Sequence, residues 1–84
     1  GNIYKGEFRS GKREGKGKYL NTSSKDMYEG DFKCDKAEGK GVAIYNNGDK
    51  YEGDYKDWNK EGKGTYYYSN GKIESGDWKN DVLI

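Results

Sequence analysis

The segment Tyr28-Glu29-Gly30-Asp31-Phe32 decides the fold of this chain, because related segments recur at intervals of 23 or 24 residues. Two further copies begin at Tyr4 and Tyr51, and a fourth, which has lost its first aromatic residue, begins at Glu74. Aromatic residues and glycine occupy every second position of a copy, and this period of two is typical of a β-strand. A unit that recurs at a fixed interval predicts a repeat array, in which each unit stacks on its neighbours.

A second glycine-rich strand is predicted after each of the first three copies. Gly-Lys-Gly begins seven residues after the last aromatic residue of the copy, at residues 15–17, 39–41 and 62–64. We expect a polar turn, such as Arg9–Glu14, to join the two strands. Asn-Gly precedes the third and fourth copies, at residues 47–48 and 70–71, and we expect it to form the tighter of the two turns.

These hairpins predict an all-β fold, a single-layer, twisted, antiparallel meander that is elongated and solenoid-like. One array covers residues 1–84, with repeats at about 4–25, 28–49 and 51–72 and a partial repeat at 74–84. Only 30% of the residues are hydrophobic, but nine are tyrosines, so we expect aromatic contacts in place of an aliphatic core. Because both ends fall within a repeat, we expect a fragment of a longer protein, or a chain that self-associates through open strand edges.

A trial register explains the glycines of this pattern. If Tyr4 lies opposite Tyr19, Gly6 lies opposite Gly17 and Phe8 lies opposite Gly15, so an aromatic ring covers a position without a side chain. The same register predicts Phe32 opposite Gly39 and Tyr55 opposite Gly62. On the other face it pairs Glu7 with Lys16, Asp31 with Lys40 and Asp54 with Lys63. Such opposite charges each stabilise a sheet by roughly 0.2–1 kcal/mol.

No constellation for catalysis is visible in the sequence. The chain lacks histidine, which removes the usual nucleophile–histidine pairs and the common zinc ligands. Cys34, beside Asp35 in a predicted turn, is expected to be an exposed bystander. Carboxylates recur in register with lysines, which is typical of a solvated sheet face. Gly-Lys-Gly lies in predicted strands and opens no helix, which disfavours a phosphate loop. We therefore expect no enzyme activity, no metal and no cofactor in this segment.

The aromatic residues are the candidate protein-binding residues. We expect most of them to pack on glycines of neighbouring strands, and some to line a groove for a partner, because a single-layer sheet cannot cover both of its faces. By alternation Tyr67 falls on the charged face, where packing does not explain it. The candidate residues are Tyr4, Phe8, Tyr28, Phe32, Tyr51, Tyr55, Tyr67 and Trp78.

The basic first turn is the candidate site for anionic lipid. The net charge of +1 predicts no bulk attraction to nucleic acid, but residues 1–25 hold seven Lys/Arg against two acidic residues. Each basic residue near an anionic membrane contributes about 1 kcal/mol. The later turns are neutral, so this feature is not repeated along the array. The candidate residues are Arg9, Lys12, Arg13, Lys16 and Lys18.

The repeated pattern resembles the MORN (membrane occupation and recognition nexus) repeat, in particular at Tyr28–Phe32, Glu38–Gly41 and Asn47–Tyr51. The resemblance covers essentially the whole chain as three repeats and a half. It implies an elongated sheet whose aromatic face forms a groove. MORN modules occur in junctophilins, plant phosphatidylinositol-phosphate kinases, a histone lysine methyltransferase and cytoskeletal proteins. They serve there as scaffolds, dimerisation surfaces, grooves for peptides or helices and lipid-binding elements, with catalysis in another domain.

The chain departs from the family pattern at several positions. Alanine at position 43 replaces the aromatic residue present at Tyr19 and Tyr66, and Thr22–Lys25 replaces the Asn-Gly turn. Where the family often has histidine after the first turn, this chain has glutamate in all three full repeats, at Glu14, Glu38 and Glu61.

The leading expectation is a non-catalytic scaffold that binds a protein segment through the aromatic face or an open edge. A second is a peripheral membrane adaptor that binds anionic headgroups such as phosphoinositides. A third is the regulatory or targeting part of a larger enzyme, such as a phosphatidylinositol-phosphate kinase. Carbohydrate recognition is more distant, because the carboxylate–lysine pairs disfavour it. A single cysteine and no visible signal peptide lead us to expect a cytoplasmic location, cytoskeletal or peripheral at a membrane.

Overall fold

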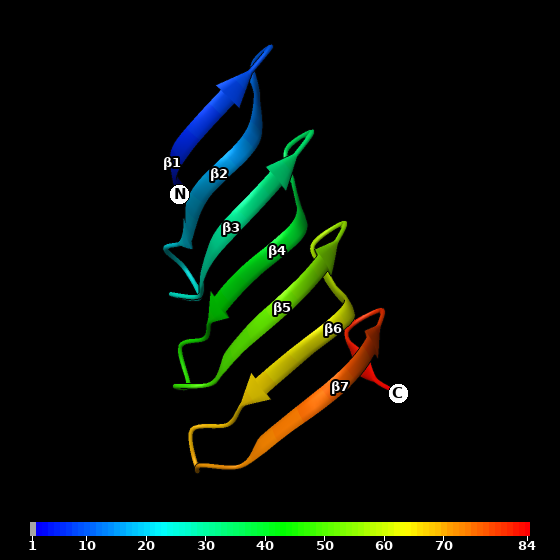
Figure 1. The fold of residues 1–84 in the computed structure, drawn as a ribbon. Coiled ribbons are helices and arrows are strands. Elements are labelled where there is room, and N and C mark those ends of the chain that lie inside the picture. The colour runs from blue at the N-terminus through cyan, green and yellow to red at the C-terminus, as the bar shows by residue number, and fades with distance from the viewer. Residues whose placement is uncertain (1) are drawn as a thin grey trace.

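The computed structural model describes residues 2–84 as one open antiparallel sheet of eight strands. The strands follow one another in chain order, and the sheet measures 39 × 25 × 16 Å (Figure 1). They are β1 (Asn2–Arg9), β2 (Lys12–Asn21), β3 (Met27–Lys33), β4 (Lys36–Ile44), β5 (Lys50–Lys56), β6 (Asn59–Tyr67), β7 (Ile73–Lys79) and β8 (Val82–Leu83). The predicted single-layer antiparallel meander is confirmed.

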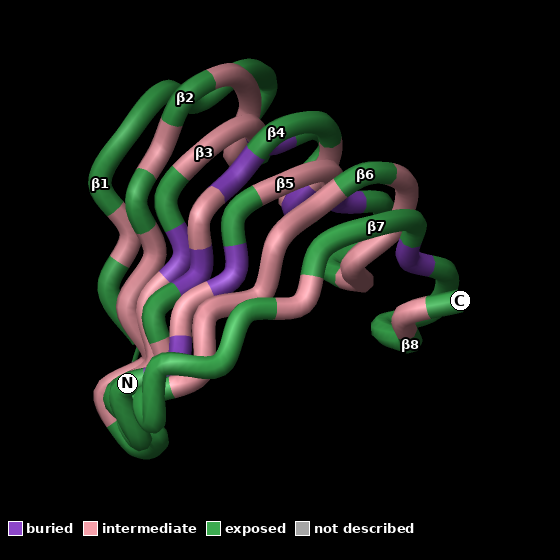
Figure 2. Tube along the Cα trace, turned by 60° about the horizontal axis from the view of Figure 1, so that its bottom comes forward, coloured by how far each residue is buried: buried purple, intermediate pink, exposed green. Residues whose placement is uncertain are grey.

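The sheet is bent along its strands, so that it has an inner and an outer face (Figure 2). The inner face carries the row that contains Tyr4, Tyr28 and Tyr51, and the outer face carries the alternate residues. The buried hydrophobic residues are Tyr28, Phe32, Ala37, Ala43, Tyr51, Tyr55 and Trp78. The core is therefore built mainly from aromatic rings, as the composition predicted, and two alanines complete it.

The trial register is confirmed at one end of each hairpin and wrong at the other. Tyr4 lies opposite Tyr19 and Gly6 opposite Gly17, but the register then shifts, and Phe8 lies opposite Arg13 instead of Gly15. The same shift places Phe32 opposite Ala37 and Tyr55 opposite Lys60, instead of Gly39 and Gly62. The three glycines lie opposite the aromatic residue of the next repeat: Gly15 opposite Phe32, Gly39 opposite Tyr55 and Gly62 opposite Trp78.

A β-bulge in the second strand of each hairpin causes this shift. Its glycines have positive φ angles, +82° at Gly15, +100° at Gly39 and +92° at Gly62, which residues with a side chain rarely adopt. The extra residues bend the strand and increase its twist. The first glycine of Gly-Lys-Gly therefore permits the bend of the sheet, which forms the inner face.

The second glycine of Gly-Lys-Gly lies beneath a tyrosine ring. A Cβ atom on Gly41 would overlap the Tyr28 ring, and one on Gly64 would overlap the Tyr51 ring. Each of these tyrosines donates its hydroxyl hydrogen to a backbone carbonyl three residues on, Tyr28 to Asp31 at 2.8 Å. The predicted packing of rings on glycine thus holds for the first aromatic residue of each copy.

The tight turns are the polar ones, so the prediction that Asn-Gly forms the tighter turn is wrong. Ser10-Gly11 and Asp57-Trp58 are two-residue turns with both φ angles positive, which defines type I′. Asn47-Gly48 lies in a five-residue connection, where Gly48 N–H donates to the carbonyl of Tyr45 at 2.9 Å. Of Asn47 and Gly48, only Gly48 has a positive φ angle. Asn-Gly here forms the end of a wider turn.

The type I′ turns stack on one another along one edge of the sheet. The backbone N–H of Asp35 donates to the carbonyl of Arg13 at 3.0 Å. The backbone N–H of Trp58 donates to the carbonyl of Ala37 at 3.2 Å. The carboxylate of Glu38 accepts a hydrogen bond from the amide of Asp57 at 3.0 Å. Glu14 and Glu61 accept the equivalent hydrogen bonds from Cys34 and Asn80, so each of these glutamates ties its repeat to the turn of the next one.

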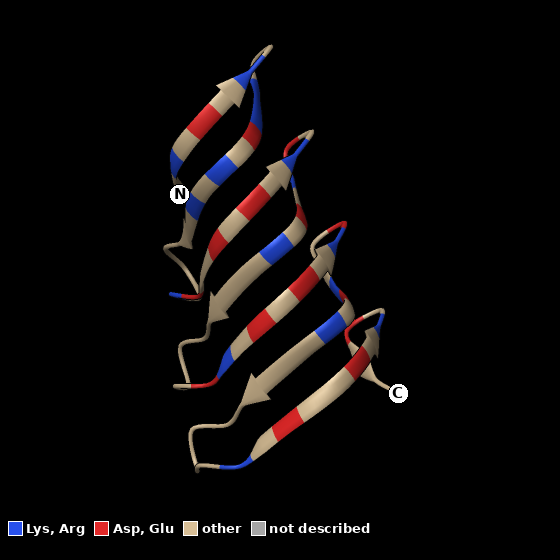
Figure 3. Cartoon of the chain, viewed as in Figure 1, with Lys and Arg blue, Asp and Glu red and all other residues tan. Residues whose placement is uncertain are grey.

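The outer face carries the predicted charge pairs, but between different repeats. Lys40 Nζ lies 2.6 Å from the Asp54 carboxylate, and Lys63 Nζ lies 3.1 Å from Asp77 (Figure 3). Asp31 was predicted to pair with the Lys40 side chain. Its carboxylate instead accepts the backbone N–H of Lys40 at 3.2 Å. The predicted pairs of lysine side chains with carboxylates inside one hairpin are thus wrong, because the bulge shifts the register.

These ion pairs make stability depend on pH. A hydrogen bond from the Lys16 ammonium holds the pKa of Asp31 below its usual value of 3.8, and Lys40 acts likewise on Asp54. A carboxyl whose pKa is lowered by folding stabilises the protein above its unfolded pKa and loses this contribution as the pH falls. We expect the urea midpoint to fall as the pH drops below about 4.

The double variant Asp31→Asn/Asp54→Asn tests this origin of the pH dependence. It should be less stable at neutral pH and show a shallower decline in acid, measured by urea unfolding at a series of pH values. Parallel pH profiles for the variant and the wild type would contradict the assignment.

Candidate functional site

The aromatic side chains of the inner face form one ladder of edge-to-face contacts. Tyr28 meets Phe32 at a centroid distance of 5.2 Å and Tyr55 at 5.0 Å, and Tyr51 meets Trp78 at 5.4 Å. The ladder contains seven of the predicted protein-binding residues: Tyr4, Phe8, Tyr28, Phe32, Tyr51, Tyr55 and Trp78. Five of them are no more than 7% exposed, so they form the core, whereas Phe8 on the edge strand is 62% exposed.

Tyr67 lies on the outer face, as alternation predicted. It lies opposite Lys50 and Ile73, and the Lys50 ammonium is 5.2 Å from the centre of its ring. Further apolar residues share its cross-strand row: Ile3, Leu20, Met27 and Ile44. This row was not predicted, because its members align only once the register between the hairpins is known.

The structure does not bring the five predicted lipid-binding residues together. Lys16 and Lys18 lie on the outer face and pair with Asp31 and Glu29. Arg13 lies on the inner face, opposite Phe8. Its Nε is 3.2 Å from the Asp35 carboxylate and its Nη2 donates to the Asp35 carbonyl at 2.7 Å. Arg9 and Lys12 remain exposed beside the first turn.

Arg13 fills an aromatic cage within the array. Its guanidinium carbon lies 5.4–5.8 Å from the centres of four rings, those of Tyr4, Tyr19, Phe32 and Trp58. A cation at such distances from aromatic faces is attracted by the ring quadrupoles. The resulting cage holds one cation, and the Asp35 carboxylate closes the cage.

Lys60 fills the equivalent cage two repeats later. Its ammonium lies 5.7–5.9 Å from the ring centres of Tyr45, Tyr51, Tyr66 and Trp78. Asp81, in the same turn position as Asp35, lies 3.5 Å from this ammonium and accepts the Lys60 backbone N–H at 2.7 Å. The signal for both cages was present in the sequence, because Arg13 and Lys60 each stand two residues before a Gly-Lys-Gly.

The middle repeat lacks both the cation and one ring of this cage. Ala37 stands where the other repeats have Arg13 and Lys60, and Ala43 stands where they have Tyr19 and Tyr66. The acidic turn residue is likewise replaced, by Trp58. Alanine in place of tyrosine at position 43 leaves space on the inner face, whereas Ala37 is fully buried.

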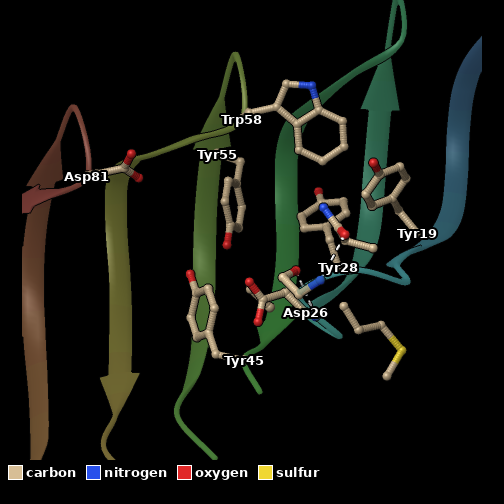
Figure 4. A pocket seen from close by; sticks show the side chains of 11 residues that line it. Tyr19, Asp26, Tyr28, Tyr45, Tyr55, Trp58 and Asp81 are labelled. Carbon is tan, nitrogen blue, oxygen red and sulfur yellow. Dashed lines mark hydrogen bonds between the residues drawn. The ribbon is translucent and has the colours of Figure 1, made fainter. Parts of the chain in front are cut away.

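A cavity of about 180 Å³ lies at this place (Figure 4). Its walls are largely aromatic, and it has a carboxylate at each of two sides. The lining side chains that matter here are Tyr19, Tyr28, Tyr45, Tyr55, Trp58, Asp26 and Asp81. Ala43 forms part of the wall and is 6% exposed, and Trp58 is 37% exposed. The cavity is therefore an open aromatic site in the middle of the ladder, between the cages that Arg13 and Lys60 fill.

Asp26 differs from its equivalent in the next repeat, Asp49. The Asp49 carboxylate is buried and accepts hydrogen bonds from Ser69 N–H at 2.8 Å and from the Tyr66 hydroxyl at 2.9 Å. These bonds, the one from Ser69 above all, lower the pKa of Asp49. Asp26 likewise accepts Asn46 N–H, at 2.9 Å. The residue equivalent to Tyr66 is alanine, which offers Asp26 no hydroxyl.

Two further observations bound the chemistry of residues 2–84. They form no helix of the length and apolar character needed to cross a membrane. They also contain no cluster of three or more His, Cys, Asp or Glu side chains suited to a metal ion. Cys34 is an exposed free cysteine in the second type I′ turn.

Comparison with known families identifies the repeat. Three consecutive segments, residues 4–23, 28–50 and 51–73, match the family model of the MORN repeat. No curated protein was found to match the chain. The three matched segments coincide with the three hairpins β1–β2, β3–β4 and β5–β6, so the family unit is the structural unit.

Proposed function

Since the chain belongs to the MORN-repeat family, whose repeats are interaction and scaffold modules, we propose that this segment is a non-catalytic module that binds a segment of a partner protein on its inner face. The proposal concerns residues 1–84, and any catalytic activity would reside outside them.

The observation that carries this proposal is the cavity above Ala43. Most of the ladder is buried, and such rings cannot contact a partner. The cavity is the place where Tyr45 and Trp58 present aromatic surface beside unfilled space. Aromatic residues in a hollow are favoured at the centres of protein interfaces. A bound segment that crosses the inner face would insert a side chain there.

The contacts of the basic residues favour a protein partner over anionic lipid. Arg13 is enclosed by aromatic rings and Asp35, and Lys16 and Lys18 have acidic neighbours. Arg9 and Lys12 alone would contribute about 2 kcal/mol at a membrane surface, at about 1 kcal/mol each. A single pair of this kind gives weak and salt-sensitive attachment.

Peptide selection tests the proposal. Peptides selected from a random display library on the folded chain should bind the inner face and perturb the amide and indole resonances of Trp58. The variant Trp58→Asn should weaken them by tenfold or more, because it removes the exposed aromatic wall. Asparagine tolerates the positive φ angle of this position.

The matched control is Tyr67→Ser on the outer face, which should leave affinity unchanged within twofold. Selected peptides whose resonance changes map to the outer face would overturn the proposal. Changes confined to the free edge of β1 would replace inner-face binding by strand addition.

A further inference from the structure

We propose that the cavity above Ala43 receives a cationic side chain, arginine or lysine, of the bound segment. This inference rests on the proposed function and specifies the chemistry of its anchor. The cavity of about 180 Å³ is smaller than the roughly 300–1,000 Å³ of pockets that hold drug-sized ligands. It therefore suits one side chain.

The array itself shows what this position accommodates. At the two equivalent positions, the rings hold the cations Arg13 and Lys60. Each of those cages combines the first and last aromatic residues of the repeat pattern with a third ring, Tyr19 or Tyr66. The middle cage retains its first and last rings as Tyr28 and Tyr55, which line the cavity.

In the middle repeat, alanine stands at two of the positions that complete the other cages. Ala37 supplies no cation, and Ala43 supplies no third ring. Tyr19, Tyr45 and Trp58 close the cavity around the space that is left. A cation from another molecule would thus occupy the environment that the chain builds for its own cations.

Charge complementarity favours a cation over a neutral group. Two carboxylates, Asp26 and Asp81, line the cavity, and because Asp81 already faces the Lys60 ammonium at 3.5 Å, Asp26 is the carboxylate that favours a bound cation. At the equivalent of Asp26, Asp49 accepts a hydroxyl hydrogen from Tyr66, a donor that Ala43 does not supply. An ammonium or guanidinium group brings both positive charge and hydrogen-bond donors to Asp26, and hydrogen bonds between ionised groups are the stronger kind.

Two small probes that differ in charge test this inference on the folded chain. Nα-acetyl-arginine methylamide and Nα-acetyl-citrulline methylamide have nearly the same shape, but only the arginine probe is charged. We expect the arginine probe to shift the Trp58 indole resonance in a saturable manner and the citrulline probe to bind at least tenfold more weakly. Equal binding of the two probes would overturn the inference.

Three variants locate the effect. Ala43→Tyr restores the residue type of Tyr19 and Tyr66, so it should fill the cavity and abolish probe binding while the protein stays folded. Asp26→Asn should reduce the preference for arginine over citrulline, whereas Glu52→Gln, on the outer face, should leave it unchanged. Arginine binding that persists in Ala43→Tyr would contradict the assigned site. If that variant does not fold, Trp58→Asn replaces it, with arginine binding followed by calorimetry because the indole reporter is absent, and binding at wild-type affinity would contradict the assigned site.

The two proposals fail in different ways. Selected peptides that bind the inner face without needing arginine or lysine would refute the cationic anchor and leave the proposed function in place. A saturable arginine site with no inner-face peptide would support the anchor and count against the proposed function.

Discussion

Replacing Tyr51 by alanine is expected to destabilise the fold by about 3–5 kcal/mol, as is typical for removing a large buried aromatic side chain. Tyr51 is 0% exposed and is the largest fully buried side chain of the described residues 2–84. Its ring contacts Tyr55 and Trp78 and lies over Gly64, so its loss opens a cavity between two repeats. Because small domains have stabilities of about 5–15 kcal/mol, the variant should be close to unfolding at room temperature.

Tyr51→Phe is the matched control for this prediction. It removes only the hydroxyl, which donates to the Asp54 carbonyl at 3.0 Å, and should cost about 0.5–1.5 kcal/mol. Urea unfolding followed by circular dichroism compares the variants. Similar losses of unfolding free energy in Tyr51→Ala and Tyr51→Phe would show that the hydrogen bond, and not ring burial, dominates at this position.

The burial of Tyr51 also makes the fold sensitive to alkali. Desolvation raises the pKa of Tyr51 to about 12, above its usual value of 10.0. A raised pKa means that the folded state favours the neutral hydroxyl, so this contribution is lost as the pH rises above about 10.

Replacing Gly53 by valine is expected to have the second largest effect, roughly 3 kcal/mol, at the upper end of the range for overpacking. A Cβ atom on Gly53 would overlap the Gly64 Cα atom and the Lys63 carbonyl oxygen. These are backbone atoms of the paired strand, so β5 and β6 would have to separate. The separation would also disturb the Tyr51 hydroxyl, which lies 2.8 Å from the same Cβ position.

Glu52→Val, one residue away on the outer face, is the control for Gly53→Val. Glu52 is exposed, and surface substitutions away from special features usually change stability by less than about 0.5 kcal/mol. Thermal and urea unfolding of the two variants should therefore differ clearly. Equal losses would mean that β-propensity at this strand, and not the close approach at Gly53, governs stability.

Several parts of the candidate site were readable as single-residue departures from the repeat. Ala43 stands out from Tyr19 and Tyr66 by alignment alone, and Ala37 stands out from Arg13 and Lys60 in the same way. That Ala43 borders a cavity was not predictable, because the other walls of the cavity come from neighbouring repeats, among them Tyr19 and Trp58. The bend of the sheet is what brings these residues together.

The charge pairs show where local reasoning fails. Alternation correctly placed Asp31 and Lys40 on the outer face, but it could not reveal the bulge in β4, which shifts the register between Gly30 and Phe32. The bulge leaves Asp31 beside the backbone of its own hairpin and directs its ion pair to Lys16 of the preceding repeat. Register near a bulge depends on φ angles, which a residue pattern does not specify.

By itself, then, the sequence determined the repeat, the hairpins, the single antiparallel layer and the separation of the aromatic row from the carboxylate–lysine row, since these follow from a period of two and from glycine spacing. Only the tertiary structure decided the register between repeats, the caging of Arg13 and Lys60 and the cavity above Ala43. The physical reason is that these features depend on contacts between different repeats, which form only when bulged strands bend around a shared inner face.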